Sequence, residues 1–151
     1  MTSSLRLRLG STLLLVVAFM LLDAPVLAQT PATAVAPAKY KAAFHVTDDD
    51  PRKWAQVLNN AKYTQDEMGA RNVEIVVVMN GGGIGMLKLE SPVAQKIEDA
   101  KKAGIHFHVC QNTMATQKLT KDDMLPEADY VTSGIGDVIK LQSQGWSYVK
   151  N

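Results

Sequence analysis

Three residues that can do chemistry alternate along one short segment of the sequence. His106, His108 and Cys110 are separated by the apolar residues Phe107 and Val109. Because successive side chains of a β-strand point to opposite faces, the three share one face if this segment is a strand. A cysteine thiolate is a nucleophile, and histidine and cysteine are also ligands for zinc or copper. The segment therefore offers either a reactive thiol or a metal centre.

The thiol of Cys110 has no partner within the chain, because Cys110 is the only cysteine. A lone cysteine is commonly a small buried apolar residue. Polar residues Gln111, Asn112 and Thr113 follow it, however, and a helix that began there would lower the thiol pKa. We therefore expect Cys110 to be a nucleophile, with Asn112 and Thr113 as binding residues beside it.

A metal centre is the alternative for the same segment. Side chains two residues apart on a strand lie about 7 Å apart, so they do not converge on one ion without a change of geometry. A complete zinc site also needs a further ligand, which the sequence does not single out. We expect no cofactor, and we keep His106, His108 and Cys110 as alternative metal ligands. Otherwise the histidines are hydrogen-bonded under a helix or at a subunit contact.

Strand and helix patterns alternate around this segment. Apolar or alternating runs predict strands at residues 41–46, 73–79, 105–110, 129–131 and 146–149. Capping residues predict helices that begin at Asp50-Pro51, Ser91-Pro92 and Ser133, with a short capped turn at 120–125. Such alternation predicts a flavodoxin-like three-layer α/β/α fold with a five-stranded, mostly parallel sheet.

The helices also have predicted inner faces. In the first helix, apolar residues at helical spacing are Trp54, Val57, Leu58, Ala61 and Met68. In the last helix, the predicted apolar face is Ile135, Val138 and Ile139, with Gln142 at its rim. Both stripes follow the period of a helix that packs against a sheet.

The predicted strand order places the crevice. For five strands we expect the order 2-1-3-4-5, which puts the crevice at the carboxyl ends of strands one and three. Those ends are residues 45–48 and 109–112, so Cys110 lies in the crevice. On this order His45 lies at the end of the neighbouring strand, as a base or a stabiliser of the thiolate, or as a further metal ligand. Asp48 is a second expected binding residue.

Glycines follow the second predicted strand, in the segment Asn80-Gly81-Gly82-Gly83-Ile84-Gly85. The spacing fits neither a dinucleotide-binding loop nor a phosphate loop with Gly-Lys-Ser/Thr. We interpret the segment as a tight turn with positive φ angles, or as a close approach to a neighbouring chain. Gly83 is the residue of this segment that we expect to contribute to a binding surface.

Residues 1–28 have the three parts of a secretory signal peptide. Arg6 and Arg8 precede an apolar run, and Val26-Leu27-Ala28 puts small residues at the cleavage positions. The run is about half the length of a membrane span, which is about 20 residues, so no stable anchor is expected after cleavage. We expect residues 29–39 to form a flexible Pro/Ala-rich lead-in and residues 40–151 to form the domain. We expect a periplasmic protein.

Charge excludes one class of partner. The whole chain has a formal charge of +1, and Arg6, Arg8 and Asp23 account for all of it, so residues 29–151 are neutral. A neutral domain gives no electrostatic reason to bind nucleic acid.

Five segments of the sequence together resemble the DsrE-like family. The residues that carry the resemblance are Phe44 to Asn60, Asn80 to Leu87, Ser91 to Ala94, Cys110 to Met114 and Leu119 to Pro126. They are most similar to the exported, poorly characterised branch of that family, over essentially all of residues 40–151. The resemblance implies a flavodoxin-like domain and a homo-oligomer, commonly a trimer or a hexamer.

The resemblance also implies a function for Cys110. In sulfur-relay members such as DsrE and TusD, a cysteine after the third strand carries persulfide sulfur between proteins, and Cys110 occupies the matching place. The implied protein is a sulfurtransferase or sulfur carrier with a sulfur donor or acceptor protein as its partner. The alternative is a non-catalytic periplasmic binding module for a small anion or a metal ion.

The signal-peptide pattern predicts a mature protein that begins at or near Gln29. Expression in a bacterium, followed by N-terminal sequencing of the periplasmic fraction, checks this expectation. Exported material that still begins with Met1 would contradict it.

Overall fold

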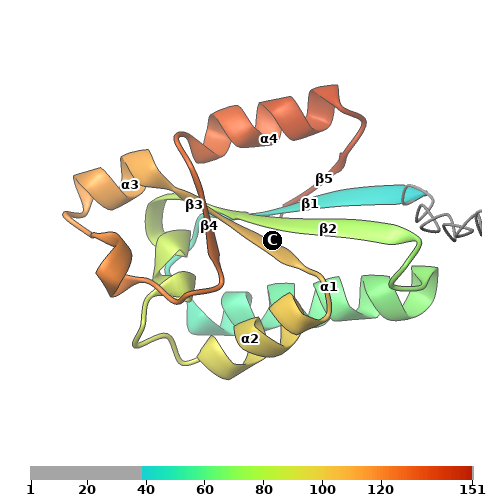
Figure 1. The fold of residues 1–151 in the computed structure, drawn as a ribbon, viewed down its shortest axis with the longest axis horizontal. Coiled ribbons are helices and arrows are strands. Elements are labelled where there is room, and N and C mark those ends of the chain that lie inside the picture. Colours follow the sequence, from blue (N-terminus) through green and yellow to red (C-terminus); the bar gives the residue numbers. More distant parts are fainter. Residues whose placement is uncertain (1–38, 151) are drawn as a thin grey trace, which may run out of the picture. The chain divides into compact units, whose positions relative to one another are not determined.

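Five β-strands and four α-helices alternate along residues 39–150, the part of the chain that this computed structural model describes (Figure 1). The strands are β1 (Tyr40–Val46), β2 (Val73–Met79), β3 (His106–Cys110), β4 (Ala128–Val131) and β5 (Ser147–Lys150). The α-helices are α1 (Pro51–Met68), α2 (Ala94–Lys102), α3 (Gln111–Thr116) and α4 (Gly134–Ser143), and two 3-10 helices are η1 (Gly81–Leu87) and η2 (Lys121–Asp123). All strand pairs are parallel, which confirms the predicted fold class.

The signal-peptide and lead-in predictions fall on residues 1–28 and 29–39, which lie outside the described residues except for Lys39. Within residues 39–150, no helix is long and apolar enough to cross a membrane.

The strand order differs from the expected one. The sheet runs β4-β3-β2-β1-β5, so β2 lies between β1 and β3. Each step from β1 to β4 moves in one direction across the sheet, and only the last connection returns to pair β5 with the free edge of β1. β2 therefore takes the centre of the sheet, and six of its seven residues are buried.

Right-handed crossovers explain how the helices divide between the two faces of this sheet. Crossovers that move in one direction place their helices on one face, and a crossover that moves back places its helix on the other. Accordingly α1 and α2 pack together on one face, and α4 lies on the opposite face over β1, β2 and β3 (Figure 1). Helices therefore cover both faces, but unequally.

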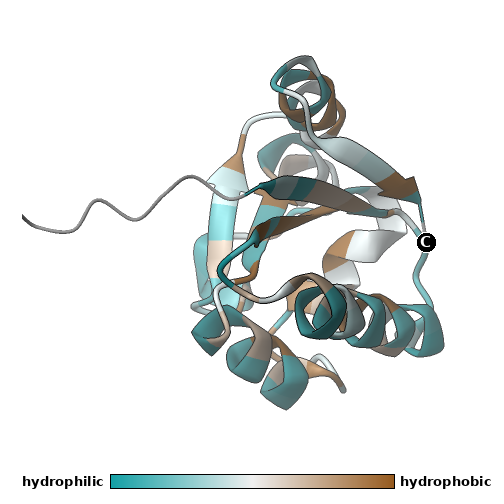
Figure 2. Cartoon of the chain, turned by 90° about the vertical axis from the view of Figure 1, so that its right-hand side faces the viewer, coloured by the Kyte–Doolittle hydropathy of each residue, from teal (hydrophilic) through white to brown (hydrophobic). Residues whose placement is uncertain are grey.

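Two apolar clusters correspond to these two faces. The larger one joins α1 and α2 to the sheet, and it includes Met114 and Met124 from the connection between β3 and β4. The smaller one lies under α4. Figure 2 shows that the helices on the α1 and α2 face are largely hydrophilic, whereas α4 on the other face has a hydrophobic side.

The predicted helix starts are confirmed at two of three places. Asp50 caps α1 by accepting a hydrogen bond from the Arg52 N–H, and Ser133 caps α4 in the same way with the Gly136 N–H. The start at Ser91 is wrong, because α2 begins only at Ala94 and no side chain caps it. The Ser91 hydroxyl instead accepts a hydrogen bond from the Val93 N–H within the preceding turn.

The predicted inner face of α4 is confirmed at Val138 but wrong at Ile135 and Ile139. Gly134, Val138 and Leu141 are buried, whereas Ile135 and Ile139 are 50% and 62% exposed. The predicted face and the buried face have the same helical spacing. They differ by a rotation of the helix about its axis that corresponds to one residue. Gly134 decides between them, because a residue without a side chain lets the helix approach the sheet. In α1, Met68 is likewise more exposed than predicted, at 38%.

The glycine segment forms η1, and the close approach that it makes is within the chain. A Cβ on Gly83 would lie 2.2 Å from the carbonyl oxygen of Val46, the last residue of β1. A Cβ on Gly85 would lie 2.8 Å from the Trp54 ring. The positive φ that the sequence predicted occurs at Gly81, at 56°, and not at Gly83. Gly83 is therefore required for space and not for backbone angle.

We expect Gly83→Ala to destabilise the domain by about 3 kcal/mol or more, because the new methyl group would overlap a backbone carbonyl that cannot rotate away. Urea unfolding measures the effect. Gly104→Ala is the matched control, since a Cβ there meets nothing within 4 Å and costs only the left-handed φ of 87°, about 1–2 kcal/mol. Equal losses for the two variants would contradict the steric explanation.

Candidate functional site

Cys110 is the last residue of β3 and directly precedes α3, so no loop separates the strand from the helix. It is a free cysteine and is 5% exposed. The sequence prediction that a helical turn begins after this cysteine is confirmed. The backbone at this point turns from strand to helix, and the first N–H groups of α3 lie next to the sulfur.

The strand order places the topological switch point of the sheet, where a crevice is expected, between β3 and β4. It forms where the connections that leave two adjacent strands pass to opposite faces. The connection after β3 packs on the α1 and α2 face, and the connection after β4 is α4 on the other face. The expected position between strands one and three is therefore wrong, but Cys110, at the end of β3, still lies at the switch point.

Four hydrogen-bond donors act on the Cys110 sulfur. Burial works to raise the pKa of the thiol and is the largest single influence on it. Four hydrogen-bond donors lower the pKa, and together they outweigh burial, so that the pKa of Cys110 is lower than that of an ordinary cysteine. The donors are the Thr113 hydroxyl and the N–H groups of Gly134, Thr113 and Asn112. The donors come from the starts of α3 and α4, on the two sides of the crevice. The thiolate is thus more favoured here than in an ordinary cysteine.

The glycine segment holds Thr113 in position. The Gly81 N–H donates to the Thr113 hydroxyl oxygen at 3.2 Å. The Thr113 hydroxyl can accept this bond and still donate its own proton, and the Cys110 sulfur is the acceptor beside it. The Gln117 amide in turn donates to the Gly81 carbonyl at 3.0 Å. α3 and η1 therefore fix each other next to the sulfur.

Gly134 brings the start of α4 close to the thiol. A Cβ at this position would lie 3.3 Å from the Cβ of Cys110 and 3.1 Å from the Cβ of Asn80. A larger residue would move the helix away and lengthen the bond from its N–H to the sulfur. Ser133, the residue before Gly134, caps the helix and so fixes the point at which it begins.

His45 does not lie on a strand next to Cys110, because β2 separates β1 from β3. It is 6% exposed, and both of its ring nitrogens have partners. Nε2 lies 2.8 Å from the Asn80 side-chain oxygen, and Nδ1 lies 3.1 Å from the Tyr148 hydroxyl. The Asn80 oxygen only accepts, so Nε2 carries the proton and Tyr148 donates to Nδ1. The expected contact with the thiol is replaced by a Tyr148–His45–Asn80 chain.

His106 and His108 do share a face with Cys110, as their alternation predicted, but each is paired with a carboxylate. His108 Nδ1 lies 2.6 Å from Asp137 on α4, and His106 Nδ1 lies 3.6 Å from Asp129 on β4. Among residues 39–150, no group of three histidines, cysteines or carboxylates is arranged to hold a metal ion.

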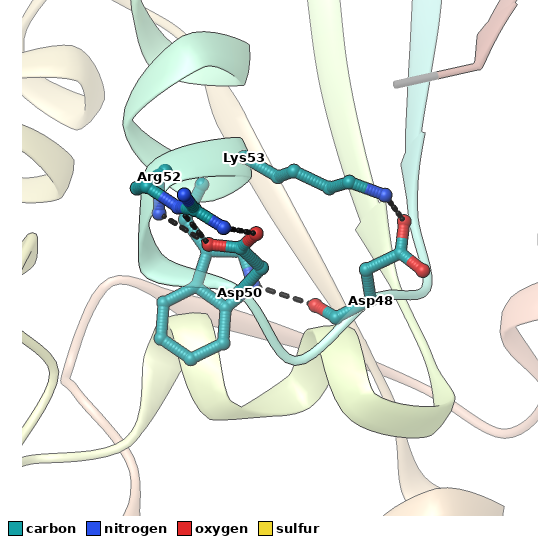
Figure 3. A network of polar contacts seen from close by, with 5 residues as sticks. Asp48, Asp50, Arg52 and Lys53 are labelled. Atoms are coloured by element: carbon teal, nitrogen blue, oxygen red, sulfur yellow. Dashed lines mark hydrogen bonds and ion pairs between the residues drawn. The ribbon is translucent and has the colours of Figure 1, made fainter.

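The other predicted binding residues lie in different surroundings. Asp48 forms an ion pair with Lys53 at 2.7 Å, and its carbonyl accepts a bond from the Trp54 indole N–H, so it belongs to the start of α1 (Figure 3). Gly83 is buried against the end of β1. Asn112 contributes its backbone N–H at the thiol. Of the predicted binding residues, the structure brings Thr113 and Asn112 to Cys110.

Sequence reasoning missed Gly134, Asn80, Tyr148 and Asp137. A signal for Gly134 was present, since Ser133 predicts a helix start directly after a strand that ends at the same edge as Cys110. Asn80 and Tyr148 carry no such signal, because their importance depends on the strand order.

Two solved structures are similar to this chain. Protein of unknown function MTH1491 from Methanobacterium thermoautotrophicum has 27% identity and a TM-score of 0.71, and the match covers 74% of this chain and 99% of that one. Conserved protein of unknown function BT1422 from Bacteroides thetaiotaomicron has 13% identity and a TM-score of 0.53, and covers 74% and 94%. The second likeness shows the fold alone.

The comparison with family models agrees with the fold and with the resemblance seen in the sequence. No curated protein matches this sequence. The model of the DsrE/DsrF-like family matches residues 41–150, which is most of the chain and all of the sheet except Tyr40. The chain belongs to the DsrE/DsrF-like family.

Proposed function

We propose that this protein accepts sulfane sulfur on Cys110 and passes it on as a persulfide. The observation that carries the proposal is the set of four donors that lower the pKa of a buried thiol. A buried thiol without such donors is more protonated and less reactive than a free one. Family membership supports the same chemistry, because it associates the fold with sulfur relay.

The transfer is a thiolate–persulfide exchange without net oxidation. The Cys110 thiolate attacks the outer sulfur of a donor persulfide, and the sulfur–sulfur bond of the donor breaks. A new sulfur–sulfur bond forms on Cys110, and the donor leaves as a thiolate. The leaving thiolate takes up the proton of the transferred outer sulfur, so that Cys110 holds a persulfide anion. The same donors that stabilise the thiolate then stabilise the persulfide anion until an acceptor thiolate attacks its outer sulfur.

The proposal gives His45 a different role from proton transfer. Its ring nitrogens are occupied by Asn80 and Tyr148, and Asn80 lies beside Gly134. We therefore assign His45 to the positioning of Asn80 at the edge of the crevice. His108 and Asp137 join β3 to α4 in a similar way, at 2.6 Å.

The proposal includes export and assembly. The periplasmic location rests on the signal-peptide pattern of residues 1–28. A homo-oligomer, and a partner protein that donates or accepts sulfur, rest on the family resemblance. A thiol that carries sulfur in an oxidising compartment benefits from having no second cysteine, since a disulfide within the chain would block it.

Removal of the Thr113 hydroxyl should raise the pKa of Cys110, because it deletes a donor that stabilises the thiolate. We expect the thiolate absorbance of Thr113→Val in the ultraviolet to appear at higher pH than that of wild type, with Cys110→Ser as the blank. His45→Ala should shift the midpoint less, since its ring bonds to Asn80 and Tyr148. A larger shift for His45→Ala than for Thr113→Val would reverse the assigned roles.

Polysulfide should load one sulfur atom onto Cys110. We expect intact-protein mass spectrometry in thiol-free buffer to show a mass increase of one sulfur atom on wild type, none on Cys110→Ser, and loss of the increase after addition of a small thiol. Thr113→Val should load more slowly at neutral pH than wild type. A folded wild-type protein that takes up no sulfur would favour the non-catalytic anion-binding module instead.

A further inference from the structure

A cavity of about 580 Å³ lies between α1 and α2, on the opposite face of the sheet from α4. Its floor is apolar and includes Leu58, Ala100 and Ile105. The volume falls within the range of clefts that hold drug-sized molecules, about 300–1,000 Å³. Such clefts combine a largely apolar surface with a few placed polar groups. The cavity is separate from Cys110, which faces the α4 side.

One buried polar group lines this cavity without a full set of partners. Gln65 is 7% exposed, and its side-chain N–H donates to the Ala103 carbonyl at 3.0 Å. That bond fixes the orientation of the amide, because a reversed amide would place two oxygens together. Among residues 39–150, no group donates to the remaining side-chain oxygen, Oε1. A buried acceptor without a donor is costly, and so a donor from outside the chain is favoured.

The charges at the mouth of the cavity cancel. Lys62 pairs with Asp66 at 2.6 Å, and Lys96 donates to Asn59 at 3.4 Å, while Asp99 accepts a bond from Gln95. Two lysines and two aspartates therefore line the cavity, and both lysines are already engaged. The formal charges of the lining sum to zero, so the cavity as a whole has no net charge that would attract an ion. The observations favour an uncharged ligand.

We propose that this cavity is a binding site for a small, uncharged, mainly apolar molecule that carries a hydroxyl or N–H group. Its apolar body lies on Leu58, Ala100 and Ile105, and its hydroxyl or N–H donates to Gln65 Oε1. This function is independent of the sulfur chemistry at Cys110, and neither requires the other.

Two matched probes test the site on the unaltered domain. Para-phenylphenol has an apolar body and one hydroxyl donor, and its methyl ether has the same body without the donor. We expect saturable amide NMR shifts confined to residues 58–70 and 96–105. The phenol should bind about tenfold more tightly than the ether, because the ether cannot donate a hydrogen bond and leaves the buried acceptor unpaired.

Variants separate the acceptor from the cavity. Gln65→Leu removes Oε1 at similar volume, and we expect the preference for the phenol over the ether to disappear. Gln56→Leu is the matched control, because Gln56 is an exposed residue of the same helix that does not line the cavity, and the tenfold preference should remain. Ala100→Phe fills the space, and neither probe should bind.

Three outcomes would overturn the proposal. The first is an absence of saturable shifts in the wild-type domain, which would leave water as the donor to Gln65. The second is equal affinity for the phenol and the ether in wild type, a result that does not depend on any variant being folded. The third is a preference for the phenol that survives in a folded Gln65→Leu variant.

Discussion

The carboxyl edge of the sheet depends on glycine backbone that lies against the end of β1. Gly83 occupies space that a single methyl group would fill, next to the Val46 carbonyl. Because η1 lies so close to β1, Gly85 can lie against the Trp54 ring, and the Gly81 N–H can reach Thr113. One steric constraint therefore connects the start of α1, the end of β1 and the donor side chain at Cys110.

The thiol environment is a balance between two opposed effects. Burial penalises the thiolate, and fixed donors compensate for that penalty because they belong to backbone and to a held hydroxyl. Donors of this kind need little reorganisation when charge develops on sulfur. Gly134 makes the balance possible, since a helix with a side chain there could not bring its first N–H to the sulfur.

The strand order explains why one expected neighbour of Cys110 is present and another is not. Thr113 and Asn112 follow Cys110 directly in the chain, and a helix that begins at residue 111 brings them to the sulfur in any strand order. His45 belongs to another strand, and its distance from Cys110 depends on which strand lies between them. Here β2 does, so His45 contacts Asn80 and Tyr148.

The sequence alone determined the alternation of strands and helices and the caps at Asp50 and Ser133. It also placed Cys110 at the end of a strand and before a helix. These features depend on residues that are close together in the chain. Only the tertiary structure decided the strand order, the face that α4 buries and the partners of His45. In α4, residues at helical spacing mark two possible inner faces, and the sequence alone does not choose between them. The close packing of Gly134 against Asn80 and Cys110 selects the face that is buried. Such choices depend on packing between segments that are distant in sequence, and local patterns carry no information about them.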